Sequence, residues 1–158
     1  MEWSKDLFSK YIKIIEDGKV VFFIKNHPWS SFASVELDGE KYGFYKNGFF
    51  TNKVSISHIP SGISVGSIEH RVLDGLVRVK YKDENYNWKK KSFFSNMFYL
   101  RKGGENLITY APKFSDGEIY TEVEDKLLVA TGMYIFLNHT ISTAVIIIIM
   151  IIIMSANS

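Results

Sequence analysis

One stretch of the sequence matches a known pattern for a catalytic serine. Residues 62–66 read GISVG, a formal G-x-S-x-G with Ser64 at its centre. In hydrolases this pattern places the serine on a sharp turn between a strand and a helix, and an acidic residue and a histidine follow. Here the residues after the pattern read as a strand, and the chain is short for a hydrolase fold. We therefore expect no catalytic residues and no enzymatic activity.

Other residue types that support catalysis or metal binding are sparse. The four histidines, His27, His58, His70 and His139, have none of the spacings of metal ligands. The chain contains no cysteine, which excludes disulfides, thiolate metal sites and cysteine nucleophiles and fits a reducing compartment. We expect no metal and no cofactor. The formal net charge of +2 is close to neutral and gives no reason to expect nucleic acid as a partner.

The densest cationic stretch is Lys89-Lys90-Lys91, and Arg101 and Lys102 follow on a neighbouring predicted strand. Strands commonly carry lysine on their solvent side, so a solvated strand face is one explanation of these residues. The functional alternative is a site for anionic lipid headgroups, where each cation near a membrane surface contributes roughly 1 kcal/mol. These residues are the candidate binding site that the sequence offers.

Two hexapeptides, NGFFTN at 47–52 and KSFFSN at 91–96, are nearly the same and lie 44 residues apart. The same spacing aligns Tyr42 with Tyr86 without gaps, and a fainter copy of the Phe-Phe stretch begins at Leu7. A period of roughly 20–50 residues usually means that one supersecondary unit is used several times. We interpret both Phe-Phe pairs as core residues at equivalent corners. The alternative is that they are loop tips that insert into a membrane.

The repeated unit consists of strands, because apolar and polar residues alternate in short runs. The runs are separated by pairs that supply the positive φ of tight hairpins, among them Asp17-Gly18, Asp38-Gly39, Asp74-Gly75, Gly103-Gly104 and Asp116-Gly117. Strands are predicted near 10–15, 20–25, 33–37, 40–46, 53–58, 64–69, 76–81, 85–90, 97–102, 106–111 and 117–123. The sequence predicts a mainly β protein, a meander of about 11–12 antiparallel strands that closes into a barrel, with two packed sheets as the alternative.

The C-terminal segment has a different composition. After Lys126 the chain has no charged residue; Leu127–Leu137 and Ala144–Met154 are apolar on every side, and residues 138–143 are polar or mixed. A helix that is hydrophobic all round is buried in a core or set in a membrane. As one helix, Leu127–Met154 would be about 42 Å long, enough to cross a bilayer core of about 30 Å, whereas each half is too short. We expect the first half to fill the barrel and the second to extend beyond it, where it could form a transmembrane helix.

The aromatic strands, the glycine turns and the segment Glu124–Asn138, which runs from acids and a lysine through Gly132, resemble the tubby C-terminal superfamily. That superfamily includes the phospholipid scramblases and the LURP-one-related proteins. The resemblance implies a barrel of about twelve strands around a hydrophobic C-terminal helix. It also implies lipid binding, because tubby domains bind phosphoinositides. The chain lacks the cysteine cluster and the proline-rich N-terminus of animal scramblases, and no family binding residue can be transferred to it.

These observations predict a barrel domain over residues 1–143, with a core helix at 126–138, and an apolar tail at 144–158. The first hypothesis is a non-enzymatic barrel on the cytoplasmic side of a membrane. It binds anionic phospholipid, uses the tail as a membrane anchor and forms homo-oligomers through that tail. The alternative is a soluble cytoplasmic module, structural or protein-binding, whose apolar tail only completes the core.

Overall fold

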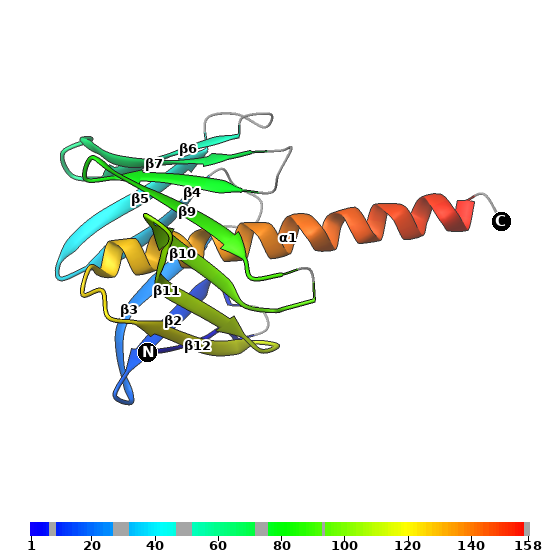
Figure 1. Ribbon diagram of the computed structural model, residues 1–158, viewed down its shortest axis with the longest axis horizontal. Coiled ribbons are helices and arrows are strands. Elements are labelled where there is room, and N and C mark those ends of the chain that lie inside the picture. Colours follow the sequence, from blue (N-terminus) through cyan, green and yellow to red (C-terminus); the bar gives the residue numbers. More distant parts are fainter. Residues whose placement is uncertain (7–8, 27–31, 47–51, 72–75, 93, 157–158) are drawn as a thin grey trace.

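Twelve antiparallel strands close into one barrel, and a single helix passes through it, in the computed structural model of the chain (Figure 1). The strands are β1 (Glu2–Ser4), β2 (Tyr11–Glu16), β3 (Lys19–Asn26), β4 (Phe32–Leu37), β5 (Glu40–Lys46), β6 (Lys53–His58), β7 (Ser64–His70), β8 (Val77–Tyr81), β9 (Glu84–Lys90), β10 (Phe98–Lys102), β11 (Glu105–Pro112) and β12 (Asp116–Thr121), and helix α1 is Lys126–Ala156. The structure describes residues 1–6, 9–26, 32–46, 52–71, 76–92 and 94–156; within α1 it describes the side chains up to residue 139 and those of 151, 152, 154 and 155.

Each strand pairs with its neighbours in sequence, and β1 pairs with β12 to close the barrel. The mainly β class, the antiparallel meander and the closed barrel are therefore confirmed. The inner wall follows from strand alternation: in β8, Val77, Val79 and Tyr81 are buried while Arg78 and Lys80 face solvent. Strand β1 was not predicted, because its three residues are too few to show a repeated alternation of apolar and polar side chains.

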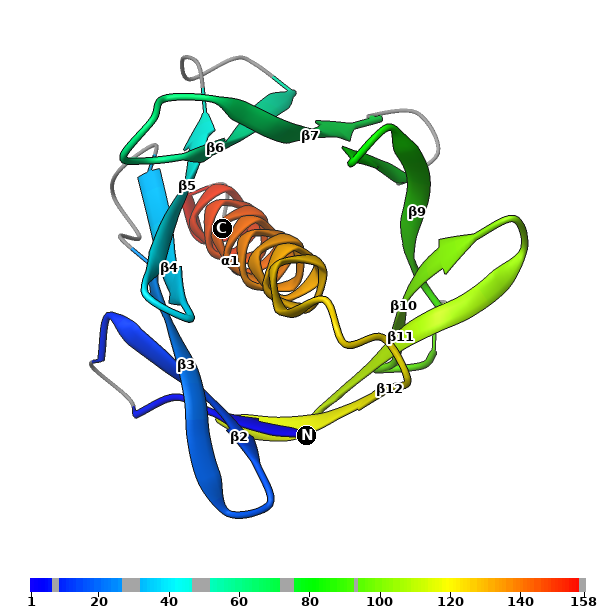
Figure 2. The same ribbon diagram turned by 90° about the vertical axis from the view of Figure 1, so that its left-hand side faces the viewer.

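Helix α1 runs through the lumen and is surrounded by the strands, as Figure 2 shows in a view into the barrel. Residues 127–137 are buried all round, as the uniformly apolar sequence predicted. Gly132 lets the wall approach closely, because a Cβ atom there would lie 2.1 Å from the Tyr110 hydroxyl oxygen. That hydroxyl donates a hydrogen bond of 2.9 Å to the Val129 carbonyl. The helix is therefore held in the lumen by close packing against the wall and by at least one buried hydrogen bond.

The sequence repeat is a structural repeat for the residues that the structure describes. Strands β3–β6 correspond to β7–β10, and Tyr42 and Tyr86 occupy the same position on β5 and β9. A shift in strand register occurs at Ile14/Ile15, at Ile56/Ser57 and at Leu100/Arg101, the same place in each copy. Such bulges bend a strand and help a barrel to curve. The predicted superposition of the Phe-Phe pairs falls on Phe49, Phe50 and Phe93, which lie outside the described residues.

Among the residues that the structure describes, three of the predicted glycine turns are correct and one is wrong, and Asp74-Gly75 lies outside the described residues. Asp17-Gly18, Asp38-Gly39 and Gly103-Gly104 all have positive φ. Asp116-Gly117 is no turn: both residues lie in β12, where Gly117 pairs with Trp3 and a Cβ atom would lie 2.6 Å from the Trp3 indole nitrogen. That glycine is required by close packing and not by a turn.

Candidate functional site

The two ends of the barrel differ in their chemistry. At the start end, which carries the tight turns 17–18, 38–39, 82–83 and 103–104, helix α1 enters the lumen. At the exit end, where β3, β5, β7, β9 and β11 finish, α1 leaves the lumen and projects well beyond the barrel (Figure 1). The candidate functional site is the exit end, which differs from the start end in its cations, its exposed aromatic side chains and the emerging helix.

Asp125 anchors the helix at the start end. Its Oδ1 accepts hydrogen bonds from the Leu127 and Leu128 amides, which makes it the N-cap of α1. The Lys82 ammonium lies 2.8 Å from Oδ2, and the Tyr81 hydroxyl donates to the same oxygen at 3.0 Å. Burial opposes ionisation of this carboxyl, but the hydrogen bond from Lys82, the Leu128 amide and Tyr81 outweigh it, so the pKa of Asp125 lies below its ordinary value. Asp125 therefore fixes the beginning of α1 to the wall of the barrel.

Replacing Asp125 with alanine should lower the free energy of unfolding by about 1–2 kcal/mol, the usual cost of a lost N-cap. Because the folded-state pKa is depressed, the carboxylate stabilises the fold above its ordinary pKa of about 4, and that contribution is lost as the pH falls through the lower folded value. Urea unfolding of the wild type and of Asp125→Asn, which keeps a capping oxygen, should therefore differ at pH 7 and converge near pH 2. Curves that stay equally separated at both pH values would contradict this assignment.

Cations gather at the exit end. At or beside the strand ends there, they outnumber the carboxylates among the described residues: the cations are Lys5, Lys10, Lys25, Lys46, Lys53, Arg71, Lys90, Lys91 and Lys113, and the carboxylates are Asp6, Glu69 and Asp116. Ion pairs occur at both ends: Lys113 lies 3.1 Å from Glu118 at the exit end, and at the start end Lys126 lies 2.7 Å from Asp38 and Lys102 3.0 Å from Glu84. The surplus of cations among the described residues predicts a positive potential at the exit end.

Two aromatic side chains of the exit end are almost fully exposed. Phe94, between β9 and β10, is 94% exposed, and Phe114, between β11 and β12, is 93% exposed. Phe94 was interpreted as a core residue, and its exposure shows that this interpretation is wrong. The Lys91 amide donates to the Met97 carbonyl at 2.8 Å and closes the base of the loop that carries it. The alternative of an aromatic loop tip fits this residue.

The far end of α1 is apolar and exposed. Ile151, Ile152 and Met154 are 60%, 59% and 71% exposed. The helix runs without interruption through the polar stretch at 138–143, so the tail continues the core helix. Among the residues that the structure describes, no helix is both long enough and apolar enough to cross a membrane. The prediction of a transmembrane helix is therefore not supported.

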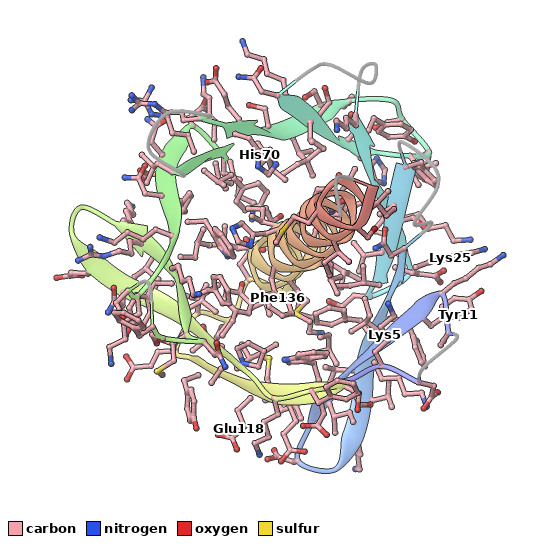
Figure 3. All side chains as sticks on the ribbon, turned by 90° about the vertical axis from the view of Figure 1, so that its right-hand side faces the viewer. Lys5, Tyr11, Lys25, His70, Glu118 and Phe136 are labelled. Atoms are coloured by element: carbon pink, nitrogen blue, oxygen red, sulfur yellow. The ribbon has the colours of Figure 1, made fainter. Side chains whose placement is uncertain are left out.

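Where α1 leaves the lumen, His139 lies among aromatic rings and positive charge. Its ring centre is 5.7 Å from that of Trp88 and 5.9 Å from that of Phe98. Burial, and then the charge of Lys90, hold the pKa of His139 below its usual value. Burial, and then Lys46 and His139, do the same for the pKa of His70. Figure 3, which views this end, shows His70 on the wall of the barrel and Phe136 on the helix. Both histidines at the rim are therefore harder to protonate than a free imidazole.

The structure separates the five cations that the sequence had grouped. Lys90 and Lys91 lie at the exit end, and Lys89 points outward from β9 opposite Tyr99. Arg101 and Lys102 lie at the start end, where Arg101 donates to the Gly104 carbonyl and Lys102 is paired with Glu84. The predicted patch is therefore not one surface, because β9 and β10 are antiparallel and their cations fall near opposite ends. Lys46, Lys53 and Arg71, which belong with Lys90, were missed because they are far apart in the sequence.

The described residues contain no cluster of three or more histidine, aspartate or glutamate side chains that could hold a metal ion. Comparison of the chain with protein-family models, with characterised proteins and with solved structures found no match. The resemblance to the tubby C-terminal superfamily thus stays a prediction. The features that point to a surface contact, the cations and the exposed apolar side chains, lie at the exit end.

Proposed function

We propose that the protein associates with membrane surfaces that contain anionic lipid, and that the exit end is the face that makes the contact. The single observation that carries this proposal is the coincidence, at one end of the barrel, of an emerging apolar helix and a surplus of cations. Phe94 and Phe114 lie at the same end. Aromatic and cationic residues around an apolar insertion are the usual composition of a membrane interface.

The two features support each other energetically. A single apolar anchor usually gives only marginal membrane binding, whereas an anchor together with a cationic patch gives stable attachment. Each cation near an anionic surface contributes about 1 kcal/mol, and apolar side chains contribute about 25 cal/mol for each Å² removed from water. The end of α1 supplies the apolar area through Ile151, Ile152 and Met154, and Lys90 and Lys91 belong to the cationic contribution.

The exposed end of α1 counts against the alternative in which the tail only completes the core. An isolated apolar surface of this kind normally marks a contact with a partner or a membrane. A soluble protein-binding module would use the same helix without needing the cations around it. Flotation of the full chain with neutral and with phosphatidylserine-containing vesicles separates these functions. Binding to the anionic vesicles supports the proposal, and the absence of flotation with both kinds of vesicle would refute it.

The variant Lys90→Glu/Lys91→Glu should weaken binding to phosphatidylserine-containing vesicles at least ten-fold, because two attractive charges of about 1 kcal/mol each become repulsive. The matched control is Lys19→Glu/Lys102→Glu, which makes the same change of charge at the start end and should bind like the wild type. Vesicle sedimentation at rising salt should reduce the difference, because charges are screened beyond about 8 Å at physiological ionic strength. Equal binding by the two double variants would show that the exit end does not face the lipid.

A further inference from the structure

Three side chains that are separated in the sequence form one hydrogen-bonded chain at the start end of the barrel. The Ser61 hydroxyl lies 2.7 Å from Nδ1 of His58, and Nε2 of the same ring lies 2.5 Å from a carboxylate oxygen of Glu40. Ser61 and Glu40 are exposed, and His58 is half-buried. A serine, a histidine and a carboxylate in this order are the parts of an activated nucleophile.

Neighbouring elements hold the three residues in place. His58 ends β6 opposite Tyr42 on β5, their rings lie 5.4 Å apart, and Glu40 begins β5 on the same face as Tyr42. Ser61 lies in the turn to β7, where the Gly62 amide donates to the His58 carbonyl at 2.9 Å. The Ile63 amide donates to the Ser61 hydroxyl oxygen at 3.3 Å. The turn thus directs the serine back toward the histidine.

The hydrogen bonds define the role of each group. A carboxylate can only accept, so Nε2 of His58 carries a proton and donates to Glu40. In the neutral ring, Nδ1 is then the acceptor and receives the hydrogen of the Ser61 hydroxyl. The nitrogens have the reverse of their roles in chymotrypsin-type enzymes, where Nε2 faces the serine. The chemistry requires only that one ring nitrogen faces the serine while the other is held by the carboxylate.

We propose that Ser61 is a nucleophile toward activated carboxylic esters, with His58 as its general base and Glu40 as the positioning residue. Ser61 Oγ attacks the ester carbonyl carbon, and its proton passes to Nδ1 of His58. The carbon–oxygen bond to the alcohol breaks, and the alcohol leaves with that proton. Water, deprotonated by His58, then hydrolyses the acyl-serine and returns the carboxylic acid and free Ser61. Ile63, 64% exposed, and Ile59, 37% exposed, lie beside the serine and favour an apolar acyl group.

This site lies at the end of the barrel opposite the proposed membrane face, in the turn between β6 and β7 at the left of Figure 1. Its substrate would therefore approach from the aqueous side, and the inference does not depend on lipid binding. It departs from the sequence-based expectation of no enzymatic activity. The G-x-S-x-G pattern had drawn attention to Ser64, but Ser64 begins strand β7 and its hydroxyl lies near the Ile56 and Gly66 carbonyls.

The test is labelling of the full chain with a fluorophosphonate probe, followed by mass spectrometry to locate the label. The wild type should carry the label on Ser61 and hydrolyse p-nitrophenyl butyrate. His58→Ala should lower the labelling rate about 100-fold or more, the usual size of a general-base contribution. Ser64→Ala is the matched control and should label like the wild type. No label on Ser61 in the folded wild type, or equal labelling of His58→Ala, would overturn the proposal.

The role of Glu40 is tested by a separate measurement, the protonation of the two ring nitrogens of His58. In the wild type, the ¹⁵N chemical shifts of the His58 ring should report a protonated Nε2 and an unprotonated Nδ1. Glu40→Ala should shift this tautomer balance and slow the labelling of Ser61 about ten-fold or more. An unchanged tautomer, or unchanged labelling despite a changed tautomer, would remove Glu40 from the proposal.

Discussion

A chain that ends at Thr143 is expected to lose binding to anionic vesicles while its barrel stays folded. The residues that fill the lumen, 127–137, all remain in this variant. What is removed includes the exposed apolar side chains of Ile151, Ile152 and Met154. Without the apolar part, the cations alone provide one of the two contributions that stable membrane attachment requires. We expect binding to fall about 100-fold, measured by flotation, with an unchanged β-type circular dichroism spectrum.

The full-length variant Ile151→Asp/Ile152→Asp is the control for this truncation. It keeps the length of the helix but places two charges on its exposed part, so it should lose vesicle binding to a similar extent. Its unfolding midpoint should match that of the wild type, because both positions are exposed. If the truncated chain unfolds, the removed segment belongs to the core. If it still binds vesicles like the full chain, α1 is no anchor.

The second large effect is expected inside the barrel, where Val129→Asp should prevent folding. Val129 is fully buried, and the neighbouring wall and helix residues Tyr110, Leu128 and Ala130 are also buried. An unpaired carboxylate at this place has no compensating partner, and its desolvation cost is comparable to the whole stability of a domain, about 5–15 kcal/mol. Guanidinium unfolding followed by circular dichroism should show no cooperative transition.

The single variant Ile151→Asp is the matched control for this experiment, because it also replaces an apolar residue of α1 with aspartate, but outside the barrel. It should unfold with the midpoint of the wild type. A cooperative transition of Val129→Asp near that midpoint would mean that α1 does not occupy the lumen. That result would also remove the structural basis for a membrane contact at the exit end, since the apolar tail lies there only if the helix passes through the lumen.

Local patterns were enough to predict most of the fold. Strand alternation depends on neighbouring residues, and the two-residue turn at Asp17-Gly18 depends on the backbone freedom of its own pair. The apolar stretch at 127–137 could only be a buried or a membrane helix, and it is buried. Lys82-Asp83 was missed as a turn because it contains no glycine. Lys82 is held there by Asp125, 43 residues later.

The sequence by itself therefore determined the strands, most of the turns, the repeat and the helix in the lumen, since each depends on side chains that are close along the chain. Only the tertiary structure decided which side chains share a surface. Antiparallel pairing sends Lys90 to the exit end and Lys102 to the start end, although the two residues lie on adjacent strands. The same pairing brings Glu40 and Ser61 to opposite sides of the His58 ring. Strand register, which follows from the packing of the whole inner wall, makes these distant contacts, and no local pattern encodes them.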